Sequence, residues 1–313
     1  MTVWLIGAGA MSVDYTKVLK ALGVEFTVIG RGLDSARRFT AETGAPVVLG
    51  GLTRELQSQE ALPEAAIVCV GVEALADTSI ELIRAGVRKL LVEKPGALST
   101  GAINELYRIA AQSGAEVFVA YNRRFYAATL HAKRIIEQDG GVLSCNFEFT
   151  EWGHEIETLT KAPGVKERWF LANSTHVVDL AFHLAGKPAR MACYTAGSLP
   201  WHPAASIFAG AGVTERGVLF SYQANWGAPG RWGVEAITTN YRLIFRPMES
   251  LQITRKGSVG IEPVKIDDSL DKLFKPGLHE QVARFLAGRH EGLCTLAEQL
   301  DKWTSYCEMA GYR

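Results

Sequence analysis

A short apolar run that ends in two glycines constrains the fold of this chain more than any other feature. Residues 3–6 (VWLI) are followed directly by Gly7 and Gly9, and residues 11–22 then place their apolar side chains at helical spacing. A strand, a glycine turn and a helix in this order are typical of the first unit of a doubly wound α/β sheet. The run is continuous rather than alternating, as a strand covered on both faces requires.

The glycine turn also predicts a binding site. Backbone N–H groups at the start of a helix have no partner within the helix, so they can bind a diphosphate. We expect the contacts to come from Gly7, Gly9, Ala10 and Met11. Ser12 stands where the dinucleotide fingerprint has its third glycine, and it is still small enough for close packing of helix on strand.

Length and composition exclude several classes of protein. The chain has 313 residues, of which 48% are hydrophobic, so it can form two domains with large cores. Its 33 basic and 33 acidic residues balance, so we expect no nucleic-acid partner and no membrane surface. A strand that begins at residue 3 leaves no room for a signal sequence, and no apolar run approaches about 18 residues, so a cytoplasmic location is expected. The five cysteines lack metal-ligand spacing and are interpreted as reduced thiols, with no metal site.

The second apolar run suggests which dinucleotide is bound. Residues 26–29 (FTVI) end at Gly30 and Arg31, about twenty residues after the first turn. An acidic residue normally holds the ribose 2′-hydroxyl of NAD at this place, whereas an arginine suits a 2′-phosphate. A solvated surface arginine is the alternative. We therefore expect NADP as the cofactor, with NAD still possible.

Strand-like and helix-like segments continue to alternate as far as residue 120. Strands are expected at residues 47–49, 65–72, 89–92 and 116–120. Helices are expected at residues 78–85, closed by Gly86, and after a cap at Ser99 or Thr100. This alternation predicts a doubly wound parallel sheet.

A charged pair stands where one of these strands ends. Glu93, Lys94 and Pro95 follow residues 89–92, and ligands of such sheets gather beyond the carboxyl ends of the strands. Pro95 restricts Lys94 to extended geometry, so the ammonium group is aimed in one direction. The alternative is a surface Glu–Lys pair of little energetic value.

A helix expected over residues 174–184 carries a polar stripe. His176, Asp179 and His183 fall within about 60° of one another on the side opposite the apolar residues. His176 and Asp179, spaced i and i+3, can meet, and Asn173 adds another polar group. A histidine that is merely solvated is the alternative. We favour His176 as a general acid/base, because imidazole exchanges a proton near neutral pH.

The remaining segments predict a second sheet with one partly exposed face. Strands with some alternation are expected at residues 146–151, 217–223, 234–238 and 241–245. Trp152, Trp169, Trp201, Trp226 and Trp232 gather in this region together with His154, Arg168, His202 and Arg231. Indole rings stack on sugars, but tryptophans are more often core or interface residues, so we expect at most two of them to contact a ligand.

At this point the chain resembles the Gfo/Idh/MocA oxidoreductases. Four stretches carry the resemblance, in the order IGAGAMS (residues 6–12), VEKP (92–95), YNRRF (121–125) and NSTHVVDLAFHLAG (173–186). Together they extend to residue 186. The last hundred residues match the family only loosely.

The resemblance implies a dinucleotide-binding Rossmann domain at residues 1–121. It further implies a substrate-binding α/β domain at residues 122–313, whose open, mostly antiparallel sheet offers a face for a homo-oligomer, a dimer or a tetramer. Family members mostly oxidise a secondary alcohol of a sugar, polyol or nucleotide sugar. In them the lysine that matches Lys94 touches the reacting hydroxyl, and the residues matching Asn122 and Arg124 border nicotinamide and substrate.

Two positions depart from the family pattern. Ala172 stands where many relatives have an aspartate that orients the helix histidine, and residues 72–76 replace a common Pro-Asn-x-x-His pattern. An NAD-dependent glycoside hydrolase and a nucleotide-binding sensor without turnover therefore stay as alternatives to a dehydrogenase. For the dehydrogenase we expect Lys94, His176 and Asp179 at the reacting centre. Glu93, Lys94 and Asn122 are expected at the cofactor, and Lys94, Arg124, Asn173, His176 and Asp179 at the substrate.

Overall fold

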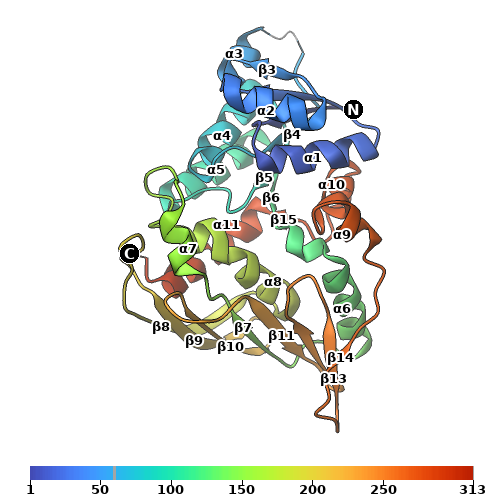
Figure 1. Ribbon diagram of the computed structural model, residues 1–313, viewed down its shortest axis with the longest axis vertical. Helices are drawn as coiled ribbons and strands as arrows, with labels where there is room; N and C mark the ends of the chain where they lie inside the picture. Colours follow the sequence, from blue (N-terminus) through green and yellow to red (C-terminus); the bar gives the residue numbers. More distant parts are fainter. Residues whose placement is uncertain (59–60, 313) are drawn as a thin grey trace. The chain divides into compact units, whose positions relative to one another are not determined.

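The computed structural model describes residues 1–58 and 61–312, which form two compact units (Figure 1). The first unit contains residues 1–122 and 270–301, and the second contains residues 123–269 together with the chain from residue 302. The chain therefore leaves the first unit, builds the second and returns. Among the described residues, no helix is both long and apolar enough to cross a bilayer.

The first unit is built on a sheet of the Rossmann type. The strand order is β15-β6-β5-β4-β1-β2-β3, and all pairs are parallel except that of β15 with β6. The strands are β1 (Thr2–Ile6), β2 (Glu25–Gly30), β3 (Val47–Leu49), β4 (Ala65–Val68), β5 (Lys89–Glu93), β6 (Glu116–Ala120) and β15 (Cys294–Thr295). The order 3-2-1-4-5-6 gives the crevice at which such sheets bind dinucleotides. The expected doubly wound parallel sheet is confirmed.

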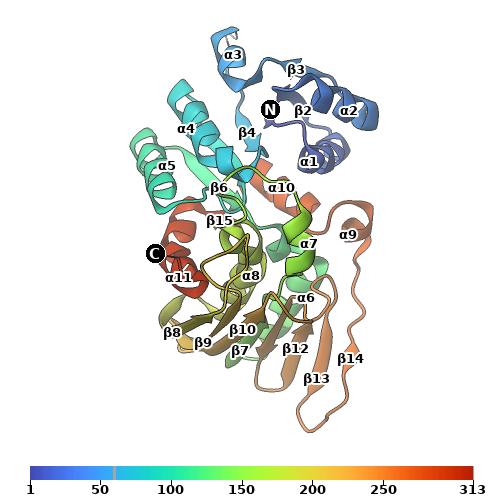
Figure 2. The same cartoon turned by 60° about the vertical axis from the view of Figure 1, so that its left-hand side comes forward.

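Helices cover both faces of this sheet. The helices are α1 (Ala10–Ala21), α2 (Leu33–Thr43), α3 (Gly51–Ser58), α4 (Leu75–Ala85), α5 (Thr100–Ser113) and α10 (Leu278–Leu286). α1 packs between α2 and α10 on one face, and α4 packs beside α5 on the other (Figures 1 and 2). The expected cap at Ser99 is confirmed, because its hydroxyl accepts a hydrogen bond from the Ala102 amide at 3.2 Å.

The boundary between the units is more complex than a single division at residue 121. Residues 270–301 lie with the first unit, although the sequence assigned all of 122–313 to the second domain. The physical reason is a set of contacts with the first sheet and its helices. β15 adds an antiparallel edge to β6, α10 packs on α1, and the Lys89 ammonium donates to the Leu286 carbonyl at 3.2 Å.

The second unit holds a mostly antiparallel sheet, as expected. Its order is β14-β13-β12-β11-β7-β10-β9-β8, in which only β7 and β10 pair in parallel. The strands are β7 (Ser144–Glu148), β8 (Pro188–Ala196), β9 (Ile207–Thr214), β10 (Leu219–Asn225), β11 (Gly233–Ile237), β12 (Tyr241–Phe245), β13 (Gln252–Arg255) and β14 (Glu262–Pro263). Its helices include α6 (Ala127–Gln138), α7 (Gly153–Thr158) and α8 (Thr175–Ala185), while α9 (Ser269–Leu273) and α11 (Leu296–Ala310) cross the boundary between the units.

The two faces of this second sheet differ. Helix α8 packs on β7 and β11 (Figure 2). Aromatic rings such as Phe147 and Phe182, with centroids 5.7 Å apart, pack between the helix and the sheet. Leu219 on β10 and Tyr194 on β8 are 63% and 70% exposed. One face is therefore the core of the unit, and the other is open.

Several expected segments have different bounds in the structure. The expected strand 65–72 ends at Val68, where β4 pairs with Ile6 at the end of β1 and with Val92 of β5, and the Cys69 amide makes one further bond to the Ile6 carbonyl at 2.9 Å. Helix α4 begins at Leu75, three residues earlier than expected, after a 3₁₀ turn at Val72–Ala74. The expected strand 146–151 is β7 at Ser144–Glu148.

Candidate active site

The glycine turn after β1 approaches the neighbouring strand closely. Gly7 has a φ of 117°, and a Cβ added to it would lie 2.7 Å from the Cys69 carbonyl oxygen. Its amide donates to the Ile29 carbonyl at 2.8 Å. A residue with a side chain would be strained at this φ and would clash with the Cys69 carbonyl, so the turn requires glycine here.

Ser12 packs in the way that its small size predicts. The side chain is fully buried, its Oγ accepts from the Gly9 amide at 3.2 Å, and it lies 3.2 Å from the Cys69 sulfur. Burial raises the pKa of the Cys69 thiol to about 12, so this sulfur is a neutral packing group. All five cysteines lie in the described part of the chain, and all are free thiols, as expected.

A cavity of about 580 Å³ opens at the carboxyl edge of the first sheet. Gly7, Gly9 and Arg31, three of the expected cofactor contacts, line it, and so do glycines at the ends of β2 and β4. Ala10 and Met11 occupy the first turn of α1 beside it but are not part of the lining, and neither are Glu93, Lys94 and Asn122. The volume and the position suit the adenosine and diphosphate portion of a dinucleotide.

Two arginines, Arg31 in the lining of this cavity and Arg54 outside it, lie against the glycine turn that starts α3. The turn that starts α3 has positive φ at Gly50 (113°) and Gly51 (82°). A Cβ on Gly51 would lie 2.8 Å from Arg31 Cγ, and one on Gly50 would lie 2.5 Å from Arg54 Cδ. The glycines thus make room for both arginine stems. Among the described residues neither guanidinium forms an ion pair.

The end of β5 is held from several sides. Tyr15 on α1 donates to the Glu93 carboxylate at 2.8 Å. Burial raises the pKa of Glu93, and the neighbouring charge of Lys94 and the bond from Tyr15 oppose that rise. The Lys94–Pro95 peptide is cis, and the Pro95 carbonyl accepts from the Gln299 amide at 3.0 Å. The segment that carries Lys94 is therefore fixed by residues far away in the sequence.

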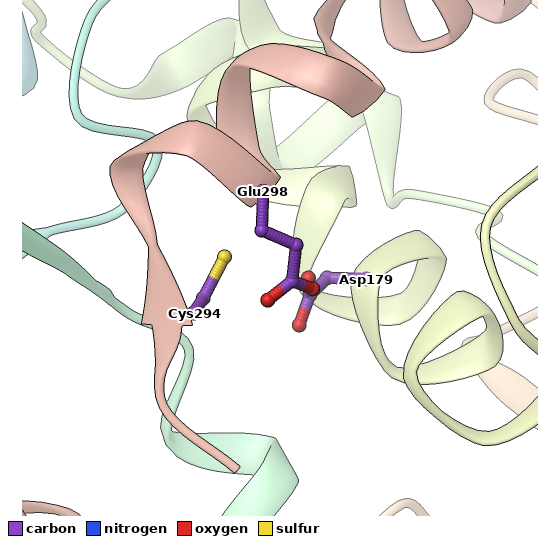
Figure 3. Close-up of side chains that lie close together, drawn as sticks. All are labelled: Asp179, Cys294 and Glu298. Atoms are coloured by element: carbon purple, nitrogen blue, oxygen red, sulfur yellow. The ribbon is translucent and has the colours of Figure 1, made fainter. Parts of the chain in front are cut away.

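The returning segment 270–301 contributes further polar groups to the first unit. Asn122, expected at the cofactor, donates its side-chain amide to the Pro276 carbonyl at 2.9 Å. Gln299 also donates to the Tyr121 hydroxyl at 3.1 Å. Cys294 at β15 and Glu298 in the first turn of α11 have their sulfur and carboxylate within 4.8 Å of each other (Figure 3).

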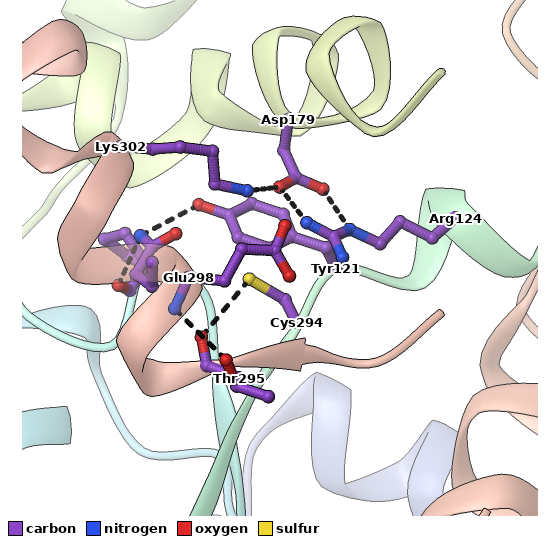
Figure 4. A network of polar contacts seen from close by, with 9 residues as sticks. Tyr121, Arg124, Asp179, Cys294, Thr295, Glu298 and Lys302 are labelled. Atoms are coloured by element: carbon purple, nitrogen blue, oxygen red, sulfur yellow. Dashed lines mark hydrogen bonds and ion pairs between the residues drawn. The ribbon is translucent and has the colours of Figure 1, made fainter. Parts of the chain in front are cut away.

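In the second unit, Asp179 occupies the centre of a buried ion cluster (Figure 4). Arg124 donates to both of its oxygens, from Nε at 2.7 Å and from Nη2 at 2.6 Å, and the Lys302 ammonium donates at 2.6 Å. All three side chains are 2% exposed or less. Burial alone raises the pKa of the Asp179 carboxyl, but the charges and hydrogen bonds of Arg124 and Lys302 outweigh it and hold that pKa well below its ordinary value.

The polar stripe of α8 differs from the expectation in one respect. Within the described chain, the contacts of the Asp179 carboxylate go to Arg124 and Lys302, and none goes to His176. Asp179 is therefore tied to the neighbouring segments instead of orienting the histidine. Burial and the charge of Arg124 lower the pKa of His183, so the third member of the stripe is held neutral.

The start of α8 is fixed by a second buried carboxylate. A π-helical turn at Phe170–Ser174 precedes α8. Asn173 donates to both oxygens of Glu151 at 3.0 and 3.1 Å, and the Ser174 hydroxyl donates at 2.7 Å. Glu151 is 2% exposed, and no motif in the sequence pointed to it as a site residue. The ring of His176 lies 6.2 Å from that of Trp232.

The fold and the cavity define a nucleotide-binding α/β protein, and comparison with known proteins identifies the family. Residues 1–121 match the Gfo/Idh/MocA model, described as an oxidoreductase family with an NAD-binding Rossmann fold. The first domain therefore belongs to this family, and the resemblance seen in the sequence is confirmed. A search of curated proteins found no match.

Solved structures support the fold of the whole chain. Levoglucosan dehydrogenase in complex with NADH and levoglucosan is similar with a TM-score of 0.79 and 16% identity, over 99% of this chain and 97% of that one. The UDP-N-acetylglucosamine 3-dehydrogenase of Acidithiobacillus ferrooxidans gives 0.75 and 14%, over 100% and 97%. The WlbA dehydrogenase of Chromobacterium violaceum, with NADH and UDP-GlcNAcA, gives 0.73 and 16%, over 99% and 92%. At these identities the likeness shows the fold alone.

Proposed function

We propose that this protein is a dehydrogenase that moves hydride between a nicotinamide dinucleotide and a secondary alcohol or ketone of a sugar, polyol or nucleotide sugar. The observation that carries the proposal is the cavity lined by Gly7, Gly9 and Arg31 in a domain of an NAD-binding oxidoreductase family. The similar structures named above, which are dehydrogenases named for or bound to sugars or nucleotide sugars, support the substrate class. The nicotinamide supplies the hydride chemistry, so the protein contributes binding, orientation and proton transfer.

Each site residue has a role in this proposal. Lys94 donates a hydrogen bond to the reacting oxygen and stabilises negative charge on it. His176 takes the proton of the hydroxyl during oxidation and returns it during reduction. Asn173, bound to Glu151, fixes the start of the helix that carries His176. Asp179 and Arg124 hold that helix through their buried ion pair, so we propose that they position the site.

The test of the proposal is the loss of turnover at Lys94. We expect Lys94→Ala to lower kcat by at least about 100-fold, because one oriented donor to a developing oxyanion supplies roughly 3 kcal/mol. Dinucleotide binding, measured by fluorescence titration, should change little. Lys89→Ala is the matched control, since it removes a lysine from the opposite end of the same strand. Turnover by Lys94→Ala equal to that of Lys89→Ala would refute the role.

Measurement of both reduced cofactor and sugar products distinguishes the dehydrogenase from the hydrolase and the sensor. Purified enzyme is incubated with either dinucleotide and a panel of sugars, polyols and nucleotide sugars, and both reduced cofactor and sugar products are measured. A dehydrogenase accumulates reduced cofactor together with a ketone. Cleaved glycoside without reduced cofactor would indicate the hydrolase. Binding of both ligands without any product would indicate the sensor, which the alanine at position 172 favours.

We further propose that the cofactor is NADP, held at its 2′-phosphate by Arg31, with Arg54 as a second donor. Both stems lie against the glycine turn that starts α3, of which Gly50 and Gly51 line the cavity, and a phosphate would supply a counter-charge that neither guanidinium has among the described residues. Arg31→Ala should raise the KM for NADP about tenfold and leave that for NAD nearly unchanged. An equal rise in the KM for NADP and for NAD would contradict this assignment, and NAD would then be the proposed cofactor.

The open face of the second sheet supports a homo-oligomer, a dimer or a tetramer. Tyr194, Ile207 and Leu219 expose large apolar side chains on three adjacent strands. Apolar surface of this kind on a sheet is commonly covered by a partner subunit. Sedimentation equilibrium of the purified protein measures the subunit number directly.

A further inference from the structure

Five side chains of the second unit form an alternating series of rings and cations. Arg231 lies over the rings of Trp152 and Trp232, with distances of 4.7 and 4.8 Å from its guanidinium carbon to the two centroids. Arg123 lies over Trp232 at 4.8 Å and over Tyr126 at 5.7 Å. We call this series, from Tyr126 through Arg123, Trp232 and Arg231 to Trp152, the cation–aromatic ladder. The two guanidinium carbons are no more than twice 4.8 Å apart, because both lie over the same ring.

The ladder lacks the anions that two such cations normally attract. Among the described residues, neither Arg123 nor Arg231 donates a side-chain hydrogen bond or forms an ion pair. Glu151 and Glu249 act on Arg123 only at longer range, and burial together with the charge of Arg231 lowers the pKa of Arg123. The two like charges thus lie over one ring, and within the described unit the carboxylates of Glu151 and Glu249 act on Arg123 without contacting it.

Two buried donors of the ladder have no acceptor. Arg123 Nε and Trp232 Nε1 are inaccessible to solvent and make no hydrogen bond within the described chain. A buried donor without an acceptor is unfavourable by about 1 to 3 kcal/mol, and by more when the donor is charged. Surface packing alone does not explain why this arrangement is kept.

The aromatic rings arrange the guanidinium groups for binding. A ring face fixes the plane of a stacked guanidinium and leaves its N–H edge free to donate two parallel hydrogen bonds. Trp152 is itself held, because its indole donates to the Gly230 carbonyl at 3.2 Å, and it is 43% exposed. The ladder is therefore ordered and partly open to solvent.

The ladder lies beside the proposed general acid/base. The rings of Trp232 and His176 are 6.2 Å apart, and Glu151, which fixes the start of the helix that bears His176, acts on Arg123. Hence a substituent of a sugar whose hydroxyl faces His176 is within reach of the ladder.

We propose that the cation–aromatic ladder binds an oxyanion of the substrate, the carboxylate of an acidic sugar or the phosphate of a sugar phosphate. That this ligand is the substrate of the enzyme rests on the proposed function, whereas binding of the anion does not. Arg123 and Arg231 donate to the oxyanion, and Trp152 offers its exposed face to the sugar ring.

The test measures binding to the full-length protein by isothermal titration calorimetry, with reduced cofactor present at saturation. The probes are D-glucuronate, D-glucose 1-phosphate and neutral D-glucose. At least one anionic probe should bind about tenfold more tightly than glucose or better, and this advantage should shrink when sodium chloride rises from low to high concentration. The probe that binds more tightly identifies the oxyanion as carboxylate or phosphate.

Variants connect this binding to the ladder. Arg231→Gln should weaken binding of the anionic probe about tenfold and leave glucose unchanged. The affinity of Arg231→Lys for the anionic probe should lie between those of the wild type and Arg231→Gln, because lysine keeps the charge but lacks the planar guanidinium. Arg255→Gln is the matched control, since it removes an arginine that lies over another ring, Tyr241 at 5.6 Å, on a different strand of the same sheet.

Each contrary result has a clear meaning. Equal affinity for charged and neutral probes, absence of binding by both anions, or equal loss in Arg231→Gln and Arg255→Gln would overturn the ladder proposal. If a neutral sugar is nevertheless oxidised, the proposed dehydrogenase activity stands and only the ladder proposal fails. If an anion binds as described but no sugar or polyol is oxidised, the dehydrogenase proposal fails and the ladder stands.

Discussion

Two neighbouring arginines, Arg123 and Arg124, have opposite surroundings. Arg124 is buried against Asp179, and with Lys302 it forms a cluster in which the Asp179 carboxylate accepts from both cations. Arg123 lies over two aromatic rings and has no hydrogen-bond or ion-pair partner in the described chain. The comparison separates a charge that stabilises the fold from one that is left for a ligand. A buried charge without a partner is retained only where something outside the fold compensates for it.

The largest effect should come from removing the shared carboxylate. Asp179→Ala removes a buried carboxylate that accepts from both Arg124 and Lys302, so we expect the free energy of unfolding to fall by about 3 to 5 kcal/mol. Urea denaturation followed by fluorescence measures it. Glu235→Ala, which breaks an exposed pair with Arg242 at 3.0 Å, is the control and should lose about 1 kcal/mol or less. Equal losses in the two variants would show that the cluster contributes no more than a surface pair.

The loss of stability in Asp179→Ala should also depend on pH. The pKa of Asp179 is lowered in the folded protein, so its carboxylate stabilises the fold above its ordinary pKa of 3.8. That contribution is lost as the pH falls further below this value. The difference in stability between the wild type and Asp179→Ala should therefore be constant near neutral pH and shrink below about pH 3.8. A difference that does not change in acid would show that packing, not charge, accounts for the loss.

The two arginines should respond differently to the same substitution. Arg124→Gln leaves Asp179 with Lys302 alone, and we expect a loss of about 2 to 4 kcal/mol, less than that of Asp179→Ala. Arg123→Gln removes only ring contacts and relieves repulsion from Arg231, so its loss should be about 1 kcal/mol or less. Both are measured by urea denaturation. If Arg123→Gln proves as destabilising as Arg124→Gln, Arg123 serves the fold, and the contrast between the two arginines is lost.

Much of the first unit could be predicted from the sequence. Its parallel strands are buried on both faces, so they are continuous apolar runs such as residues 116–120, which form β6. Gly7 and the Ser99 cap are local signals as well, because a turn or a helix start depends on residues within a few positions. In the second unit, β8 gave no such signal, because this edge strand is mostly exposed and carries no clear alternation.

The strand–turn–helix order and the glycines that line the cavity of the first unit follow from local signals in the sequence, which also predicts Lys94 and His176 as the acid–base groups. The pairing of the charges follows only from the folded chain. Asp179 meets Arg124 from 55 positions earlier and Lys302 from 123 positions later, and Arg123 meets Arg231 at the ring of Trp232. The two kinds of interaction differ in the sequence separation over which they act. Hydrophobic periodicity and turn chemistry act over a few residues, whereas the pairing of a buried charge depends on which distant segments the finished core brings together.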